Sequence, residues 1–279
     1  MAETAFQKQY RQEFIAGFEF GQSMLRTTTT TEMMRQGNEA IFLVADTNDA
    51  EAVTRGVNGL IPSRGDNLNQ FTATLVEWHD KVRRTRFNIF GSQGDGRKIM
   101  QDGTVKVMNR KIDDTILAEL NTATNDTGAA TTGSLALVAK AKAILGVNDV
   151  PVEEEDNLFG VISPAMEAYL LQDDGYTSAD YVDMKPLVGP ARKMRRWAGI
   201  NWMIHSRVPG VGTAAEKCFV YHRSSIGHAA DTEAVKAVPG YNEEEDYYYA
   251  RTSLFMGAKL LQNSGVVVIN HDGSAMVAS

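Results

Sequence analysis

Aromatic side chains recur every four residues near the start of the chain. Phe6, Tyr10, Phe14 and Phe18 would share one face of a helix, with charged residues on the other faces. The β-branched threonines at 27–31 then disfavour helix. The pattern predicts an aromatic-faced helix on a non-helical tether. This helix is either an arm that reaches a groove elsewhere or a segment that docks onto its own domain.

Two apolar segments with strand character flank a long polar stretch. EAIFLVAD (39–46) and FTATLVEWH (71–79) favour strands, and the second alternates apolar and polar residues. The stretch between them exceeds the about 12–15 residues that loops of compact domains usually span. We therefore predict a two-stranded ribbon over about Ala45 to His79, with its tip near Pro62 to Asn69. Such a ribbon is marginally stable alone and needs a partner surface.

Apolar residues between Val105 and Leu120 recur at three- and four-residue intervals, which predicts a long amphipathic helix. Asp113, Asp114 and Glu119 fall outside its apolar face. Capping residues predict two further helices. The first lies between Ser134, as N-cap, and Gly146, as the stop; the second begins with Ser163 as N-cap and Pro164 at its first position.

The rest of the chain is dominated by strand patterns. INWMIHSRVP reads as a strand that ends at Pro209, and KCFVYHRSSIGHAA as a strand feeding a short helix. YYYARTSLFMGAKLL and GVVVIN read as closing strands, the second apolar enough for a sheet interior. The pattern is of the α+β class, without regular βαβ repetition.

Composition narrows the class of protein. With 279 residues, 43% of them hydrophobic, the chain can bury a sizeable core. Its net charge of -7 argues against a protein built mainly to bind phosphates. The single cysteine, Cys218, lies in an apolar run and is expected to pack. Because no signal-peptide core or membrane-length apolar run is present, we expect a soluble protein of a reducing cytoplasm.

No catalytic, cofactor or metal site is predicted. The five histidines lack metal-ligand spacing, and GSQGDG (91–96) lacks the Gly-Lys-Ser/Thr ending of a phosphate loop. The acidic runs at 153–156 and 243–246 are expected to be solvated loops.

A basic cluster precedes two tryptophans in ARKMRRWAGINWMIHSRVPG (191–210). Arg192, Arg195 and Arg196 next to aromatic residues are typical of a nucleic-acid surface. In an acidic protein, pairing with carboxylates at an interface is the alternative. The cluster alone does not decide between the two.

Several short matches, taken in order, resemble major capsid proteins of tailed bacteriophages, which share a fold with bacterial encapsulin shells. LFGVISPAMEAYLLQD resembles the family's strand, Ser-Pro and helix entry into the axial domain. RRWAGINWMIHSRVPG resembles its glycine–strand–proline segment. KCFVYHRSSIGHAA and SLFMGAKLLQNSGVVVI resemble a later segment and the closing strands, so the resemblance covers nearly the whole chain.

The resemblance implies a Hong Kong 97-like capsid fold of the α+β class, with an N-arm, an extended E-loop, a spine helix, a peripheral domain and an axial domain. The spine helix would be 105–120. The implied boundaries are 1–44 for the N-terminal arm, 45–79 for the E-loop ribbon, 80–158 for the peripheral domain with the spine helix, 159–238 for the axial domain and 239–279 for return strands of the peripheral domain.

The resemblance also implies a structural coat protein, not an enzyme, that self-assembles through hexamers and pentamers into an icosahedral shell around phage double-stranded DNA. Expected partners are copies of itself, portal, scaffolding and decoration proteins, and packaged DNA bound non-specifically, with no membrane and no cofactor. The shell would be a virion capsid assembled in the bacterial host cytoplasm. An encapsulin-like compartment and a soluble enzyme with a long lid are the alternatives. Expected inter-subunit contact residues are Phe6, Tyr10, Phe14, Phe18, Arg64, Asp66, Arg192, Arg195 and Arg196.

Overall fold

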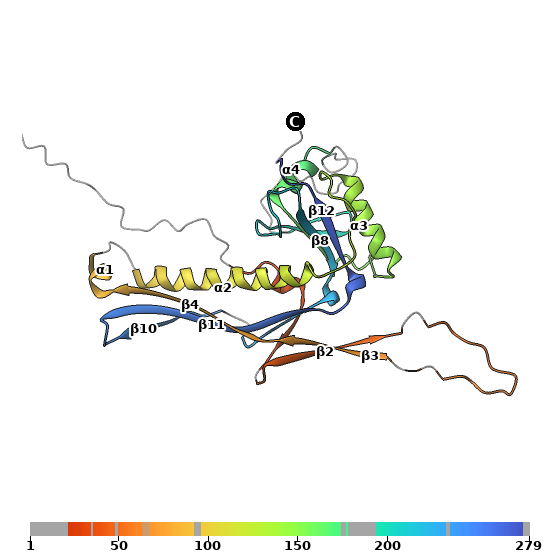
Figure 1. Cartoon of the computed structure of the whole chain (residues 1–279), viewed down its shortest axis with the longest axis horizontal. Coiled ribbons are helices and arrows are strands. Elements are labelled where there is room, and N and C mark those ends of the chain that lie inside the picture. The colour runs from red at the N-terminus through yellow and green to blue at the C-terminus, as the bar shows by residue number, and fades with distance from the viewer. Residues whose placement is uncertain are drawn as a thin grey trace, which may run out of the picture.

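The structure is a computed structural model that describes residues 22–34, 36–47, 50–63, 65, 67–91, 96–173, 177, 194–232 and 235–275. A long sheet carries a helix along one face, a second sheet lies beyond one end of that helix, and a ribbon projects from the body (Figure 1). The mixed helix and sheet architecture confirms the α+β class expected from the sequence.

The long sheet is built around one strand of 14 residues, β11 (Tyr247–Leu260). β4 (Val76–Thr85) pairs antiparallel along one edge of β11. Along the other edge, β10 (Val238–Asn242) and β9 (Ile226–Ala230) pair with opposite ends of β11. β1 (Thr30–Met33) adds a parallel strand beyond β9. A single strand therefore joins the two halves of the sheet.

Helix α2 (Gly96–Leu120) lies along this sheet, preceded by the short α1 (Arg86–Gly91) (Figure 1). The helix begins at Gly96 rather than at Val105, because buried Met100 and Thr104 extend its packed face toward the N-terminus. Its apolar face is confirmed. Asp113 is a correction: the periodicity excludes it from the packed face, yet it is buried.

The second sheet has the order β12–β8–β5–β7–β6 and is flanked by two helices. β5 pairs parallel with β7 and antiparallel with β8, so its five residues are all buried. The remaining bounds are β6 (Arg195–Trp197), β7 (Ile200–Ile204), β8 (Glu216–His222), β12 (Val266–His271), β5 (Leu158–Ile162), α3 (Leu135–Val147) and α4 (Pro164–Leu170).

Both predicted N-caps are confirmed. Ser134 Oγ accepts a hydrogen bond from the Leu137 amide at 3.3 Å, and Ser163 Oγ accepts one from the Met166 amide at 3.0 Å. The predicted stop at Gly146 is wrong, because α3 continues to Val147. Similarly, β7 ends at Ile204, before the predicted end at Pro209.

The ribbon consists of β2 (Glu39–Asp46) and β3 (Asn67–Thr74), paired antiparallel over their full lengths. β2 has the predicted bounds. The second strand does not run from 71 to 79 without a break, because Leu75 separates β3 from β4, which belongs to the long sheet. The predicted tip is also wrong: residues 67–69 are paired, and the chain turns at Gly56–Leu60, where the Gly56 amide donates to the Leu60 carbonyl at 3.1 Å.

Two strands lie in different sheets from those expected. Ile226–Ala230 was predicted as helix in the axial part; it forms β9 of the long sheet, after the single turn η2 (Arg223–Ser225). β12 was expected among the peripheral strands; it pairs with β8 of the second sheet, after η3 (Asn263–Gly265). Thus β8–β9 and β11–β12 cross together from one sheet to the other. The crossing is tight, since a Cβ at Gly265 would lie 1.9 Å from Ser225 Oγ.

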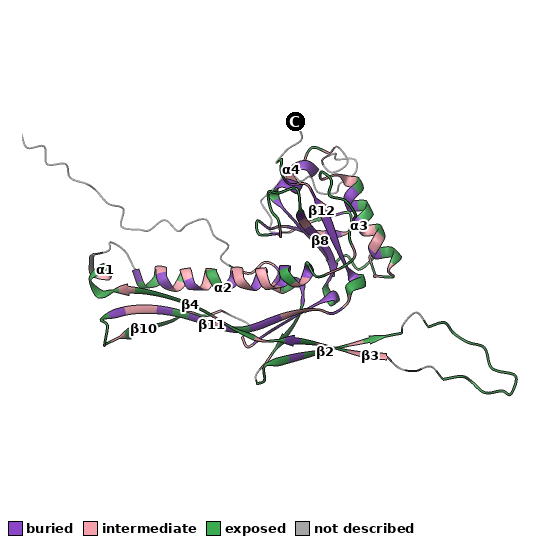
Figure 2. Cartoon of the chain, in the orientation of Figure 1, coloured by how far each residue is buried: buried purple, intermediate pink, exposed green. Residues whose placement is uncertain are grey.

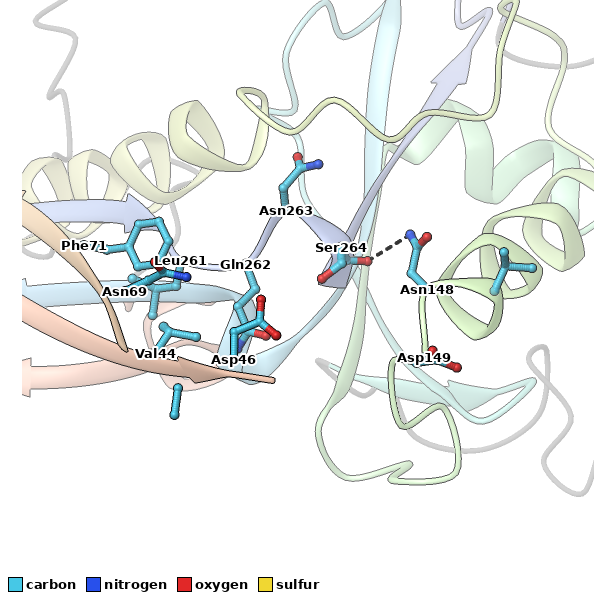
Figure 3. A pocket seen from close by; sticks show the side chains of 12 residues that line it. Val44, Asp46, Asn69, Phe71, Asn148, Asp149, Leu261, Gln262, Asn263 and Ser264 are labelled. Atoms are coloured by element: carbon cyan, nitrogen blue, oxygen red, sulfur yellow. Dashed lines mark hydrogen bonds between the residues drawn. The ribbon is translucent and has the colours of Figure 1, made fainter. Parts of the chain in front are cut away.

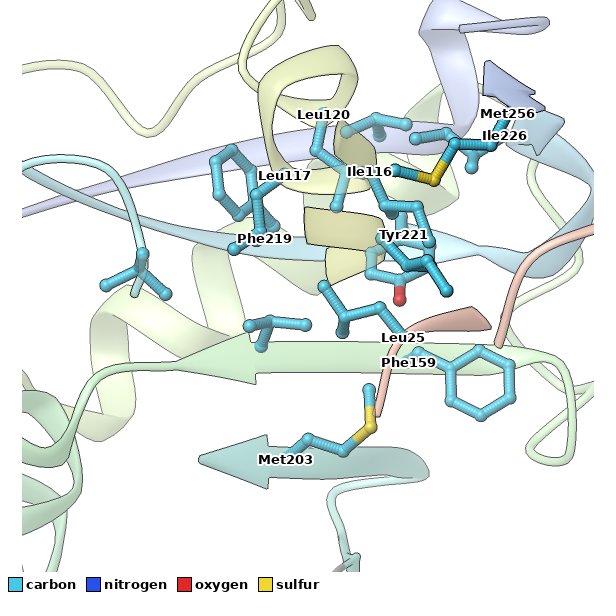
Figure 4. Close-up of a cluster of buried hydrophobic side chains, with 14 of the residues drawn as sticks. Leu25, Ile116, Leu117, Leu120, Phe159, Met203, Phe219, Tyr221, Ile226 and Met256 are labelled. Carbon is cyan, nitrogen blue, oxygen red and sulfur yellow. The ribbon is translucent and has the colours of Figure 1, made fainter. Parts of the chain in front are cut away.

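A buried apolar cluster joins the two sheets. It contains Leu25 from the N-terminal segment, Ile116 from α2, Phe159 and Tyr221 from the second sheet, and Met256 from β11 (Figure 4). Buried residues concentrate on α2, β8, β11 and β12, whereas the ribbon loop is exposed (Figure 2). The two sheets and α2 therefore form one body, from which the ribbon extends.

Candidate assembly surfaces

The ribbon exposes apolar side chains along its length. The alternation of β2 buries Ala40 and Phe42 against the body and leaves Ile41 and Leu43 on the solvent side. In the loop beyond the strands, the apolar side chains are 64–107% exposed. These loop residues are Val53, Val57, Leu60 and Ile61. Concentrated apolar exposure of this kind marks an interaction surface.

The paired strands of the ribbon, and not its loop, pack on the body. Phe42 covers Gly227 of β9, where a Cβ would lie 2.8 Å from the Phe42 ring. Ala73 and Leu261 belong to the same small cluster, which is separate from the two larger cores. The position of the ribbon is thus set by its paired strands, and the loop makes no contribution to these cores.

A cleft of about 550 Å³ lies between the loop-side ends of β2 and β3, the end of α3 and the turn after β11 (Figure 3). Phe71 and Leu261 give it an apolar side, and Asn148 Nδ2 donates to the Ser264 carbonyl at 3.3 Å. The described residues that line it include the carboxylates of Asp46 and Asp149 but no histidine, cysteine, lysine or arginine. The cleft lacks the basic side chains that usually activate a nucleophile.

The face of the long sheet opposite α2 carries cations over aromatic rings. Lys81 Nζ lies 4.7 Å from the Tyr249 ring centroid, and the Arg83 guanidinium lies 5.6 Å from that of Tyr247. Phe255, on the same face, is exposed. The acidic turn at 243–246 is exposed beside them, as the sequence predicts. This face combines apolar, cationic and acidic groups, a composition suited to a protein partner.

Two arginines of the basic cluster, Arg195 and Arg196, pair with carboxylates of their own chain. Arg195 lies 3.5 Å from Glu167, and Arg196 pairs with Glu155 at 3.1 Å and with Asp156. These pairs lie within one chain, so the predicted pairing of Arg195 and Arg196 with carboxylates at a subunit interface stays a prediction. The acidic run at 153–156 is therefore more than a solvated loop, because two of its members hold Arg196.

The tryptophans after this cluster are not available for stacking on bases. Trp197 is 9% exposed and Trp202 is 4% exposed. Trp202 Nε1 donates to the Trp197 carbonyl at 3.0 Å, and both rings belong to the core of the second sheet. A nucleic-acid surface built on these rings is therefore excluded by their burial.

The other predicted contact residues lie outside the described part of the chain. They are Phe6, Tyr10, Phe14, Phe18, Arg64, Asp66 and Arg192. The threonine run after the aromatic segment is not a free tether, because Thr28 and Thr29 are buried and β1 starts at Thr30.

The structure contains two buried acid–histidine pairs that the sequence patterns do not indicate. Asp113 Oδ2 lies 3.4 Å from His205 Nε2, and Glu216 Oε1 lies 3.0 Å from His271 Nδ1. All four side chains are at most 2% exposed. The members of each pair are far apart in the sequence, so no local spacing could have revealed them.

Cys218 packs in the core, as predicted. Burial raises the pKa of its thiol to about 12, so the unreactive thiol form dominates at neutral pH. Among the described residues, no group of three or more His, Cys, Asp or Glu side chains is placed to hold a metal ion. No helix in the described part of the chain is long and apolar enough to cross a membrane.

Comparison with known proteins identifies the family. Residues 2–273 match the family model described as phage capsid protein. The fold is similar to that of a Mycobacterium phage Che8 structure, with 16% identity and a TM-score of 0.75 over 97% of this chain and 98% of that chain. The capsid of cyanophage P-SCSP1u has 12% identity and a TM-score of 0.71, covering 99% of this chain and 94% of its own. For the capsid of a native GTA particle the values are 12% identity, a TM-score of 0.72, and 97% and 96% coverage.

No curated protein is significantly similar to the chain in sequence. The family match nevertheless covers almost all of it, and the fold agrees with the Hong Kong 97-like architecture that the motif order implies. The chain belongs to the phage capsid protein family: it is a structural major capsid protein of a bacteriophage, and copies of it build the virion shell.

Proposed function

We propose that the ribbon and the N-terminal segment of each subunit are clasps that bind neighbouring subunits in an icosahedral shell of hexamers and pentamers. The exposed ribbon loop carries this proposal. Its apolar side chains at Val53, Val57, Leu60 and Ile61 have no cover among the described residues. A partner that recurs around a closed ring is the simplest source of such cover.

Covering the loop would stabilise the shell and not the subunit. Full burial of one aliphatic side chain contributes about 1.5–3 kcal/mol, so four such residues supply several kcal/mol at each contact. The loop makes no contact with the cores of its own chain. Burial of its apolar side chains therefore stabilises the protein only in the assembled shell, where a neighbouring subunit covers the loop.

The finer contacts of the shell are also proposals. We infer that Phe6, Tyr10, Phe14 and Phe18 form the distal part of the N-terminal clasp, and that Arg64, Asp66 and Arg192 contact neighbours. Arg195 and Arg196 remain candidates because their side chains are 33% and 44% exposed beside the carboxylates of their own chain.

We further infer that the shell encloses phage double-stranded DNA without sequence preference and has no catalytic role. Assembly in the host cytoplasm with portal, scaffolding and decoration proteins is part of the same proposal. The net charge of -7 supports a container that repels its contents rather than binding them tightly. We propose an arm (1–44), an E-loop ribbon (45–79), a peripheral domain with the spine helix (80–158), an axial domain (159–238) and return strands of the peripheral domain (239–279). Four segments depart from these bounds: 39–44 belong to the ribbon strand β2, 76–79 and β9 belong to the long sheet, and β12 belongs to the second sheet.

Replacement of residues 50–63 by a short Gly-Ser turn tests the clasp. The melting temperature of the unassembled subunit should stay nearly unchanged, because the loop lies outside the cores. Electron microscopy should show that closed shells are lost. As matched controls, changing Val53, Val57, Leu60 and Ile61 to serine should also abolish shells, whereas Val147→Ser should not, although Val147 is 82% exposed. Normal shells from the shortened chain would contradict the proposal.

A further inference from the structure

The root of the N-terminal segment, residues 23–33, is held by one buried carboxylate. Asp113 of α2 is 2% exposed and accepts hydrogen bonds from Ser23 Oγ at 2.6 Å and from the Met24 and Leu25 amides at 3.1 Å each. Leu25 is fully buried in the core that joins the two sheets. Three donors from adjacent residues thus converge on one side chain, which positions the segment on α2.

Beyond this anchor the segment can leave without dismantling a sheet. β1 lies at the outer edge of the long sheet and pairs only with β9 among the described strands. All four of its residues are exposed. Detachment of residues 23–33 would break one edge pairing, the contacts to Asp113 and the Thr28–Tyr221 hydrogen bond, and it would withdraw Leu25 from the core, while β9 keeps its pairing with β11.

His228 of β9 lies next to this segment, in a buried environment that disfavours the charged imidazolium. It is 0% exposed, it pairs in register with Thr31 of β1, and neither of its ring nitrogens has a hydrogen-bond partner among the described residues. The charged groups that act on it are Arg26 from the segment and Asp113 from α2. Asp113 in turn faces His205, which follows β7, and the β8 hydroxyl of Tyr221, which lies 2.5 Å from Thr28 Oγ1.

We propose that residues 23–33 form an acid-sensitive latch, closed by the Asp113 carboxylate and opened when His228 takes up a proton. The latch would let the root of the N-terminal segment detach while the rest of the subunit stays folded. The proposal concerns the subunit itself and does not depend on the clasp function of the ribbon.

The direction of the pH effect follows from linkage. Burial, reinforced by the Arg26 cation, lowers the pKa of His228 from 6.5 to about 4 in the closed state. Lifting the segment exposes the imidazole to water and restores its ordinary pKa. Protons therefore bind the open state preferentially, so the closed state keeps its full advantage above pH 6.5 and loses it as the pH falls toward 4.

Hydrogen exchange in the full-length unassembled chain tests the latch. For peptides from residues 22–34, the opening equilibrium, corrected for intrinsic exchange, should rise up to about a hundredfold between pH 7.5 and pH 4.5. His228→Gln, which cannot titrate, should remove this rise. Peptides from α3 should not respond. The proposal would be overturned if the opening equilibrium rose equally in the wild type and in His228→Gln. It would also be overturned if the rise disappeared in His205→Gln but persisted in His228→Gln.

Asp113 and its neighbour Asp114 provide a matched pair of variants. Asp113→Asn should open the segment roughly tenfold to a hundredfold at pH 7.5, because it removes charged acceptors from the three donors. Asp114→Asn should leave it closed, since Asp114 pairs at the surface with Arg207, at 2.8 Å, and has no hydrogen bond to the described residues of the segment. Equal exchange in both variants would overturn the role of Asp113. If Asp113→Asn does not fold, the His228→Gln comparison decides. Shell formation is scored separately by electron microscopy, so failure of the latch and failure of the clasp are distinguishable.

Discussion

At the scale of single residues, close contacts at glycines fix the packing of the second sheet. Gly160 on β5 lies under the Trp202 ring, where a Cβ would come within 2.3 Å of a ring carbon. The Trp202 ring is held from its other end by its hydrogen bond to the Trp197 carbonyl. Neither partner has room to move, so glycine is required at this position.

Gly160→Ala should therefore lower the free energy of unfolding by about 1–3 kcal/mol, the usual range for overpacking a core. The control is Gly103→Ala on α2, where a Cβ would meet no atom within 4 Å. There, alanine should raise the free energy of unfolding by about 0.5–1 kcal/mol through helix propensity. Denaturant unfolding of the unassembled subunits measures both values. A Gly160→Ala subunit whose free energy of unfolding equals that of the wild type would contradict this packing.

Residue roles were predictable only where the signal is local. The caps at Ser134 and Ser163 followed from the next few residues. Asp113 was misjudged because its helical position lies off the apolar stripe, and its three donors come from a segment about 90 positions away. Arg196, the arginine partner of the acidic run, is also remote in sequence, 40 and 41 positions from Asp156 and Glu155.

At the scale of elements, alternation predicted strands well and turns poorly. β2 has the bounds that the pattern indicates, because one face packs on the body and the other does not. The ribbon tip was misplaced because the register, which pairs Asp46 with Asn67, centres the loop near Gly56–Leu60. The helix predicted for residues 226–230 is wrong because this segment forms a strand by pairing with β11, which comes later in the chain.

Two truncations separate the arm from its root. Removal of residues 1–21 should leave the subunit folded with a nearly unchanged melting temperature, because the contacts of Ser23 and Leu25 are kept, but should weaken assembly. Removal of residues 1–31 should lower the free energy of unfolding of the subunit by at least about 3 kcal/mol. It deletes buried Leu25 and leaves the buried Asp113 carboxylate without its three hydrogen-bond donors.

Circular dichroism and size-exclusion chromatography measure the two effects. If the shorter truncation unfolds the chain, the aromatic segment belongs to the core of its own subunit and the arm interpretation is wrong. If the longer truncation is as stable as the shorter, the buried root contributes less than its contacts indicate.

At the scale of the whole molecule, the order of motifs predicted the fold although no single motif was specific. Strand, Ser-Pro and helix at 158–170, then the glycine–strand–proline segment, then the closing strands, match an architecture in which two strands cross between sheets. The crossing itself was not predictable, because it depends on η2 and η3 packing together. The family match over residues 2–273 agrees with that order.

Charge reversal at the basic cluster tests what this surface contributes to the whole shell. Changing Arg195 and Arg196 to glutamate removes partly exposed ion pairs, each worth no more than about 1 kcal/mol, and adds repulsion from Glu155, Asp156 and Glu167, so the melting temperature of the free subunit is measured alongside. Shell yield should fall more than the DNA content of the shells that do form. Normal yield with DNA-poor particles would favour a nucleic-acid role instead.

Hydrogen exchange of the ribbon loop, residues 50–63, compared between wild-type shells and free subunits, measures whether neighbouring subunits cover the loop. The account predicts rapid exchange in the free subunit, where Val53, Val57, Leu60 and Ile61 are exposed, and strong protection in the shell, where a neighbour covers them. Equal exchange in both states would contradict it, because the loop would then have no partner in the assembled particle.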